Sequence, residues 1–209
     1  FLHCDLLIIG AGPSGLQSAL MAARSGAKVI MADEDFLLGG SLNGDHCQIN
    51  NDTAIKWVKN TIEELESFKN VRLMPKTTIY GAFDHGIFGA LEIKTNLDRI
   101  KSDNPRQVLW RIYAKQSILC SGSSERSLLF GNNDRPGIML SRSVRQYCNR
   151  WGIIPGKKIS IYTNNDDGWI TAKDLKEAGC NVVMVIDERS DIVVPIKNVD
   201  YRLGKKVVD

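Results

Sequence analysis

The stretch IIGAGPSGLQSALMAARSGAKVIMADED, residues 8–35, decides the fold of this chain. It overlaps a short apolar run at 4–10 that is typical of a buried parallel strand. The spacing of apolar residues that follows predicts a helix over 13–25, which Gly26 ends, and a second buried strand over 28–33. A strand, a helix and a strand within about thirty residues make a βαβ unit.

Three glycines, Gly10, Gly12 and Gly15, form the pattern GxGxxG between this strand and helix. Gly10 allows a tight turn, Gly12 lets a pyrophosphate approach the backbone, and Gly15 lets the helix pack closely on the strand. The helix N-terminus then presents free N–H groups and a positive dipole end to a diphosphate. The acidic run 33–35 ends the second strand, where a carboxylate binds ribose hydroxyls and repels a 2′-phosphate. The pattern predicts a site for the ADP half of NAD or FAD and disfavours NADP; the alternative is a βαβ unit without a ligand.

The last third of the chain repeats the first, because residues 159–187 align with residues 6–34 without a gap. Thr163 and Asn165 replace the first two glycines, and the third is kept as Gly168. The Asn165 side chain is expected to fill the space of a pyrophosphate, and the acidic pair 166–167 to cap the helix in place of a phosphate. We therefore expect no dinucleotide in this second unit.

The segment between the two repeats predicts a helix over 53–68 with Asp52 as its N-cap. Its buried face is expected to carry Ile55, Val58, Ile62 and Leu65. A small antiparallel insert is expected next, with a polar hairpin connection at 96–106 and strands at 71–74, 77–83, 86–94 and 107–113. A further buried strand is expected at 115–122, and a helix near 140–151.

Together these elements predict an α/β protein with a Rossmann-type, three-layer FAD/NAD(P)-binding fold like that of glutathione reductase. It would contain two βαβ units and the small antiparallel insert. The first dinucleotide-binding unit, with the insert, is expected to span residues 1–125. A degenerate second unit is expected over 126–209, cut short within a strand that begins in the run LGKKVVD at 203–209. The start at Phe1, without a methionine, likewise suggests a fragment of a longer protein.

The composition is that of an ordinary soluble protein: 209 residues, 43% hydrophobic, 24% charged, with a net charge of +3. No basic cluster favours nucleic acid, and no apolar run is long enough to span a membrane. No signal peptide precedes the first strand, so a cytoplasmic location is expected.

The five cysteines include no CxxC pair and are expected to be free thiols, mostly buried. Cys47 follows Gly39 and Gly40, a glycine pair that FAD domains like that of glutathione reductase carry at this place. The disulfide reductases of that group have two cysteines after the glycines, whereas here Cys47 stands alone, so a redox disulfide is not expected. The neighbouring His46 and Cys47 do not by themselves make a metal site.

Two polar motifs leave their roles open. Asp84 and His85 could act as an acid–base pair, but neighbouring strand residues point to opposite faces, which favours a hairpin turn. The motif NNDRPG at 132–137 is either a rigid turn before Pro136 or a loop that faces a flavin or another subunit.

Six stretches, which together cover residues 5 to about 190, have a specific combined pattern: GAGPSGL, ADEDFLLGGSL, TTIYGAFDHGIFGALE, PRQVLWRIYAKQSILCSGSSER, NNDRPGIM and TNNDD. In this order they resemble one family, the alpha subunit of heterotetrameric sarcosine oxidase. The second and fifth are more specific than GxGxxG. CSG at 120–122 departs from the Ala-Thr-Gly of related proteins but keeps small residues and the glycine.

The resemblance implies that this segment holds NAD, within a larger subunit that also has a ferredoxin-like domain before it and a tetrahydrofolate-binding module after it. Amine oxidation would take place at an FAD in a beta subunit, with FMN near the alpha–beta interface and with gamma and delta subunits completing the oxidase. An FAD-binding subunit of a related amine or opine oxidase, and a scaffold with a structural nucleotide, are the alternatives. The resemblance implies that nine positions contact NAD: Gly10, Gly12, Ser14, Gly15, Asp33, Glu34, Asp35, Ser41 and Ile79. Ile79 would contact the adenine through its backbone.

Overall fold

A computed structural model describes residues 1–94 and 105–208, so the predicted hairpin connection at 96–106 lies almost wholly outside the described residues. The chain forms two compact units. The first unit comprises residues 1–43 and 47–122, and the second comprises residues 44–46 and 123–209. Within the described part of the chain, no helix is long and apolar enough to cross a membrane.

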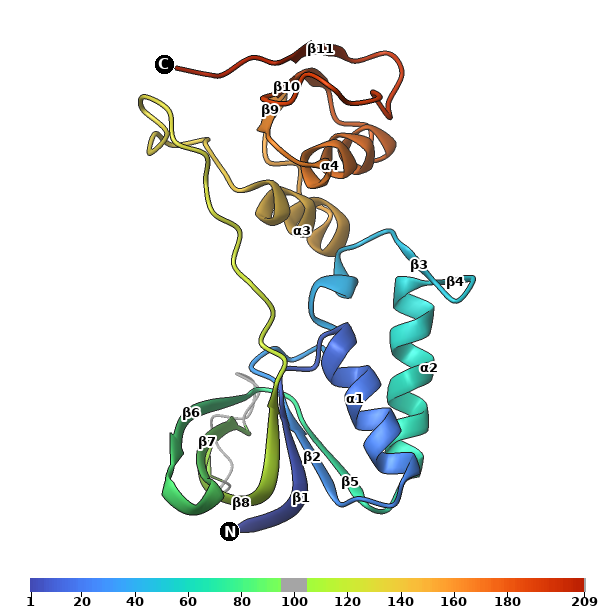
Figure 1. The fold of residues 1–209 in the computed structure, drawn as a ribbon, viewed down its shortest axis with the longest axis vertical. Coiled ribbons are helices and arrows are strands. Elements are labelled where there is room, and N and C mark those ends of the chain that lie inside the picture. Colours follow the sequence, from blue (N-terminus) through green and yellow to red (C-terminus); the bar gives the residue numbers. More distant parts are fainter. Residues whose placement is uncertain (95–104, 209) are drawn as a thin grey trace. The chain divides into compact units, whose positions relative to one another are not determined.

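The first unit is built on one six-stranded sheet in the order β5-β2-β1-β8-β7-β6 (Figure 1). Strands β5, β2, β1 and the end of β8 run parallel, whereas β6, β7 and the start of β8 form an antiparallel meander. The bounds are β1 Leu2–Ile9, α1 Pro13–Arg24, β2 Val29–Ala32, α2 Ala54–Ser67, β5 Val71–Met74, β6 Thr77–Phe83, β7 Ile87–Ile93 and β8 Gln107–Leu119. Two short strands, β3 Gln48–Ile49 and β4 Asp52–Thr53, pair before α2.

Two cores lie on opposite faces of this sheet, which explains the continuous apolar run of β1. Ile8 belongs to the core beneath α1 and α2, together with Leu16 and Leu65. Leu7 points to the other face and packs with Phe88 of the meander. Figure 1 shows α1 and α2 on one side of the parallel strands, with β6 and β7 curling away on the other. The predicted three-layer α/β fold is confirmed.

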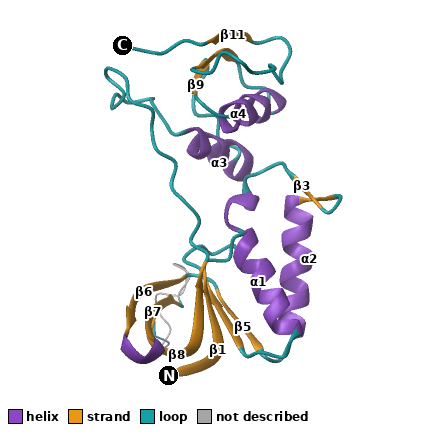
Figure 2. Ribbon diagram, in the orientation of Figure 1, coloured by secondary structure: helices purple, strands orange, loops and turns teal. Residues whose placement is uncertain are grey.

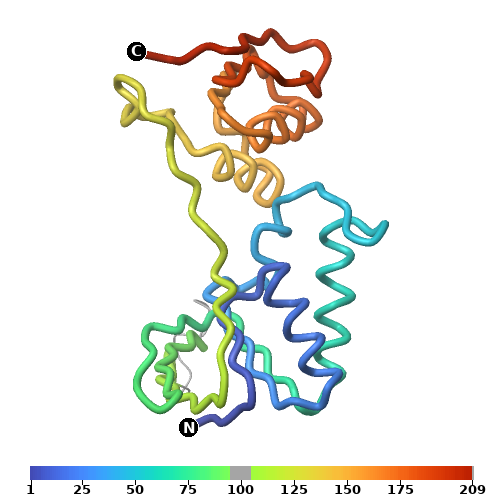
Figure 3. Tube along the Cα trace, in the orientation of Figure 1, coloured from blue at the N-terminus to red at the C-terminus, as the bar shows by residue number. Residues whose placement is uncertain are grey.

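The predicted insert begins later than expected and is not separate from the main sheet. The strand at 71–74, β5, pairs in parallel with β2 and is the outer strand of the parallel sheet. The strands predicted at 107–113 and 115–122 are one strand, β8, because no turn residue interrupts the chain at Ala114. It pairs with β7 in its first half and with β1 in its second (Figure 3).

Two details of the predicted helix at 53–68 are wrong. Its N-cap is Thr53, whose hydroxyl accepts a hydrogen bond from the Lys56 amide at 3.4 Å, while Asp52 pairs with the Lys56 ammonium at 2.6 Å. Ile55 is 61% exposed, because the buried stripe of α2 starts one residue earlier, at Ala54, and continues through Val58 and Leu65.

The second unit contains a three-stranded parallel sheet in the order β11-β10-β9 and two helices. Its bounds are α3 Ser141–Trp151, β9 Ile159–Thr163, α4 Asp166–Glu177, β10 Val182–Asp187 and β11 Asp200–Leu203. Helix α4 matches α1 residue for residue in the gapless repeat, which confirms a second βαβ unit. The expected strand at 203–209 is wrong, because β11 ends at Leu203 and residues 205–208 form no strand. Residues 123–140 are loop and turn (Figure 2).

Candidate functional site

The glycine turn after β1 is a point of close backbone contact. Gly10 has φ +101°, and a Cβ there would overlap the Cys120 carbonyl at the end of β8. Gly15, in the first turn of α1, lies so near Gly10 that a Cβ would overlap the Gly10 carbonyl oxygen. These two glycines therefore serve the packing of the turn, as the pattern predicts.

Gly12 differs from both, because it faces open space. A Cβ at Gly12 would have no described heavy atom within 4 Å, and the backbone, at φ −70° and ψ −174°, suits any residue. Gly12 is also the N-cap of α1, and none of the described side chains caps this helix. Pro13 begins the helix, Ser14 is exposed in its first turn, and that turn holds no acidic residue. The result is a helix N-terminus with exposed space before it, which suits an anionic group.

Asp33 lies directly beside this turn. Its Oδ2 accepts a hydrogen bond from the Ala11 amide at 2.6 Å, and its Oδ1 accepts one from the Asp35 amide at 2.8 Å. The side chain is half-buried, and each carboxylate oxygen keeps a further lone pair. Asp33 thus fixes the turn and the end of β2 together and presents its remaining acceptor capacity at the same place.

The loop after β2 packs against the glycine turn. The Gly39 amide donates to the Ala11 carbonyl at 2.8 Å, and a Cβ on Gly40 would come within 2.8 Å of the Gly12 Cα. Ser41 follows in a 3-10 turn at Gly40–Asn43 and is half-buried. The structure therefore brings the loop that carries Ser41 next to the glycine turn.

The remaining predicted positions directly follow Asp33 in the chain or lie on strand β6. Glu34 is exposed, and Asp35 is half-buried with its Oδ1 accepting from the Leu37 amide at 3.2 Å. Ile79 is on β6, which starts beside Asp33, because the Thr77 amide donates to the Asp33 carbonyl at 2.8 Å. Ile79 packs partly into the core between the meander and the sheet.

In the second βαβ unit, side chains of the chain itself occupy the positions that correspond to the glycine turn. The side-chain oxygen Oδ1 of Asn165 accepts a hydrogen bond from the Asp167 backbone amide at 2.9 Å and so caps α4. Asp166 and Asp167 place two carboxylates in the first turn. Thr163 fills the place of Gly10, and a Cβ on Gly168 would overlap its side chain. This helix N-terminus is capped and negatively charged, unlike that of α1.

A carboxylate that the sequence alignment missed completes the contrast. An irregularity between Val182 and Met184 adds one residue to β10. As a result Asp187 pairs with Thr163 on the neighbouring strand β9 and occupies the place that Asp33 has in the first unit. Asp187 is fully buried and accepts from the Trp169 indole at 2.7 Å and from the Arg189 guanidinium at 2.9 Å.

Arg189 also donates to Asp166 at 2.8 Å, so it bridges the start of α4 and the end of β10. Burial alone would raise the pKa of Asp187, but the hydrogen bonds from Arg189 and Trp169 outweigh it and hold that pKa below its usual value. The carboxylate is therefore ionised and fully engaged by protein groups.

The structure also shows the two polar motifs and the cysteines. Asp84–Gly86 form a 3-10 turn in which His85 has φ +62°, so the hairpin interpretation is confirmed. In the loop at 132–137, Asn132 has φ +59° and its side chain accepts from Arg135 at 2.9 Å. The five cysteines are free, and three are buried, Cys4, Cys148 and Cys180; Cys120 is half-buried and Cys47 exposed.

Comparison with known proteins points to flavin-dependent oxidoreductases. Residues 5–78 match the family described as FAD dependent oxidoreductase. The chain is 44% identical over 99% of its length to the sarcosine oxidase subunit alpha of Rhizobium meliloti (strain 1021), and 39% identical over 91% to that of Corynebacterium sp. (strain U-96). In each case it covers 20% of the relative, so the chain spans about a fifth of the length of these proteins.

Among solved structures, the L-proline dehydrogenase of P. horikoshii is similar with a TM-score of 0.72 and 25% identity, over 92% of this chain and 37% of that one. The predicted FAD/NAD(P)-binding fold and the resemblance to sarcosine oxidase alpha subunits are both confirmed. The cofactor named in the family description is FAD, which favours the FAD alternative over the NAD that the resemblance implied.

Proposed function

We propose that this chain, whose likeness to sarcosine oxidase alpha subunits extends over nearly its whole length, is the dinucleotide-binding part of a flavin-dependent oxidoreductase acting on an amine. The likeness to an L-proline dehydrogenase, another protein named for oxidising an amine, supports the same reaction class. The substrate class that follows is an N-methyl amino acid such as sarcosine.

One observation carries the assignment of the binding site: the start of α1 is uncapped and faces open space, with Asp33 beside it. A pyrophosphate fits there because Gly12 has no side chain and the helix N-terminus carries free N–H groups and a partial positive charge. The adenosine ribose would then lie at Asp33, whose oxygens keep lone pairs for its hydroxyls. Ser14, Glu34, Asp35, Ser41 and the backbone of Ile79 are proposed to complete this site.

The chain's own residues bind and orient the ADP half, and the redox chemistry belongs to the other end of the cofactor, which supplies hydride transfer. FAD is the first candidate, because the matched family is described by it. NAD is the second, because the resemblance of the motifs implies it. The ADP half is common to both, so the residues around Gly12 and Asp33 suit either one.

Release of the bound nucleotide tests this proposal. The full chain, purified under native conditions, is denatured, and the released small molecule is identified by mass and by its visible absorption. We expect one molecule per chain of a nucleotide with an ADP half; a flavin spectrum selects FAD, and its absence together with the mass of NAD selects NAD. A chain that releases no nucleotide and binds neither compound when they are added would overturn the proposal.

The assembly is also proposed from the resemblance. The chain would work with a beta subunit that carries FAD, with FMN near their interface, with gamma and delta subunits, and with tetrahydrofolate bound by a further module. Sarcosine-dependent oxygen consumption by the copurified complex is the expected activity. A scaffold role is the other candidate: a variant that loses the nucleotide but keeps both the assembly and full turnover would favour it.

A further inference from the structure

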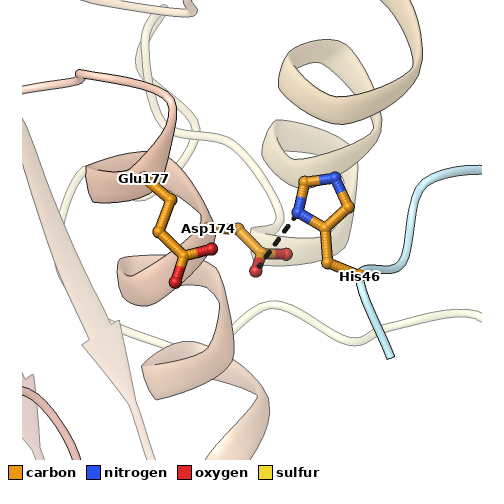
Figure 4. A group of neighbouring side chains, drawn as sticks. All are labelled: His46, Asp174 and Glu177. Atoms are coloured by element: carbon orange, nitrogen blue, oxygen red, sulfur yellow. Dashed lines mark ion pairs between the residues drawn. The ribbon is translucent and has the colours of Figure 1, made fainter. Parts of the chain in front are cut away.

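We propose that His46, Asp174 and Glu177 of the second unit form a binding site for a divalent transition-metal ion such as Zn²⁺. One ligand atom from each residue lies within 4.8 Å of the other two, and Figure 4 shows the three side chains turned toward one another. An imidazole nitrogen with two carboxylate oxygens is a donor set that Zn²⁺ accepts, and three protein ligands leave a position for water.

The two carboxylates come from one face of α4. Asp174 and Glu177 are three residues apart, so their side chains are neighbours on the helix surface. Asp174 is almost fully buried, with a side chain only 4% exposed, whereas Glu177 is exposed. A buried carboxylate is costly unless it is paired, so the direction in which each Asp174 oxygen points is informative.

The Oδ2 atom of Asp174 is held by the protein. The Asn149 amide donates to it at 3.0 Å, and the Arg145 Nε lies 3.5 Å away. The Oδ1 atom faces His46 instead, with Nδ1 at 3.9 Å, which is too long for a hydrogen bond (Figure 4). One oxygen of a buried carboxylate is thus oriented by its neighbours while the other points at a potential metal ligand, the arrangement that supporting residues give to metal-binding carboxylates.

His46 is brought to this face by the short segment 44–46. Asn149, which orients Asp174, also donates to the Gly44 carbonyl at 2.8 Å. Asp45 pairs with the buried Arg145 guanidinium. The same side chains therefore position both the histidine and the buried carboxylate, although the two lie far apart in the sequence, at positions 46 and 174.

The local charge favours a cation. Four carboxylates gather around the single guanidinium of Arg145 and the imidazole of His46: those of Asp45, Asp167, Asp174 and Glu177. The Arg145 guanidinium donates to Asp45 and, at 2.7 Å, to Asp167, so it already neutralises part of this set. The Lys173 ammonium lies 3.8 Å from the Glu177 carboxylate, a weak exposed pair that a metal ion would displace.

Equilibrium dialysis of the full chain against Zn²⁺, with the bound metal counted by atomic emission, tests the proposal. His46→Ala and Glu177→Gln change exposed side chains and are expected to fold, and each should bind one Zn²⁺ fewer per chain than the wild type or bind it at least about tenfold more weakly. Asp191→Asn, an exposed carboxylate of the same unit outside the cluster, is the matched control and should bind as the wild type does.

Equal Zn²⁺ binding by the wild type and by both cluster variants would overturn the proposal, as would equal losses in the control. The nucleotide is measured in the same samples. Because the metal ligands belong to the second unit and the nucleotide site to the first, loss of one kind of binding with retention of the other separates failure of this proposal from failure of the proposed function.

Discussion

Replacing Gly12 by alanine should weaken nucleotide binding while leaving the fold almost as stable as before. The new Cβ would enter the open space in front of α1, where the pyrophosphate is proposed to lie, and would meet no described heavy atom within 4 Å. The Gly12 backbone has negative φ, so alanine can adopt it without strain. The substitution is therefore expected to lower the affinity for the nucleotide and to leave the packing of the protein unchanged.

Both magnitudes follow from these contacts. For stability, alanine is a poorer N-cap than glycine by up to about 1 kcal/mol, and the loss of chain entropy in the unfolded state returns about 0.4–1 kcal/mol, so the net change is close to zero. For binding, a methyl group that holds the pyrophosphate away from the helix removes at least one hydrogen bond to a charged group, about 1.5–3 kcal/mol. That corresponds to a rise in Kd of roughly 10- to 150-fold.

The assay is isothermal titration of the nucleotide-free full chain with ADP, the half that FAD and NAD share, alongside urea unfolding. Gly26→Ala is the matched control, because Gly26 has φ +84° and also faces no described atom within 4 Å, but lies at the far end of α1. That variant should lose about 1–2 kcal/mol of stability and bind ADP normally. Wild-type affinity in Gly12→Ala, with Gly26→Ala behaving as described, would refute the placement of the pyrophosphate.

Three further outcomes are expected. NAD should bind at least about tenfold more tightly than NADP, because a 2′-phosphate would approach the Asp33 carboxylate, and equal affinities by titration would contradict this. Nucleotide binding should saturate at one molecule per chain, and Asn165→Gly should add no second site, since Arg189 still pairs with the Asp187 carboxylate that a ribose would need. A stoichiometry of two molecules per chain would contradict this. Cys47 should react readily with iodoacetamide at pH 8, whereas Cys4, whose pKa burial raises to about 11, should react only as the pH approaches that value; equal labelling of both by mass spectrometry would be inconsistent with the structure.

The sequence predicted those parts of the fold that are determined by residues close together in the chain. The glycine spacing and the flanking apolar runs predict β1, α1 and β2, because a tight turn and a doubly buried strand each leave a local signal. The pairing of β5 left no such signal. An apolar strand has the same composition beside β2 as it would have in a meander, and its partner is decided by the path of the chain through α2.

Some residues of the candidate site could likewise be predicted from the sequence, whereas their contacts could not. Gly12 and Asp33 could be found from spacing, because a dinucleotide imposes a fixed distance between the turn and the ribose. The hydrogen bond from Ala11 to Asp33 could not, since it depends on how the turn bends back to β2. His46 and Asp174 share no pattern in the sequence and are brought together by the hydrogen bonds of Asn149 and by the contacts of Arg145 with Asp45 and Asp174.

The second unit satisfies with its own side chains the polar groups that correspond to the proposed nucleotide site of the first unit. In the first unit no described side chain caps α1, and the Asp33 carboxylate accepts only backbone amides, so both keep hydrogen-bonding capacity for the proposed nucleotide. In the second unit Asn165 caps the helix and Arg189 joins Asp166 to Asp187, so the corresponding groups are satisfied by the chain itself. The extra residue in β10 that aligns Asp187 with Thr163 hides this replacement from a gapless alignment, which matches Asp187 to Glu34 instead. We therefore expect the stability of the second unit to be independent of nucleotide, whereas the proposed nucleotide would supply the turn of the first unit with further hydrogen-bond partners.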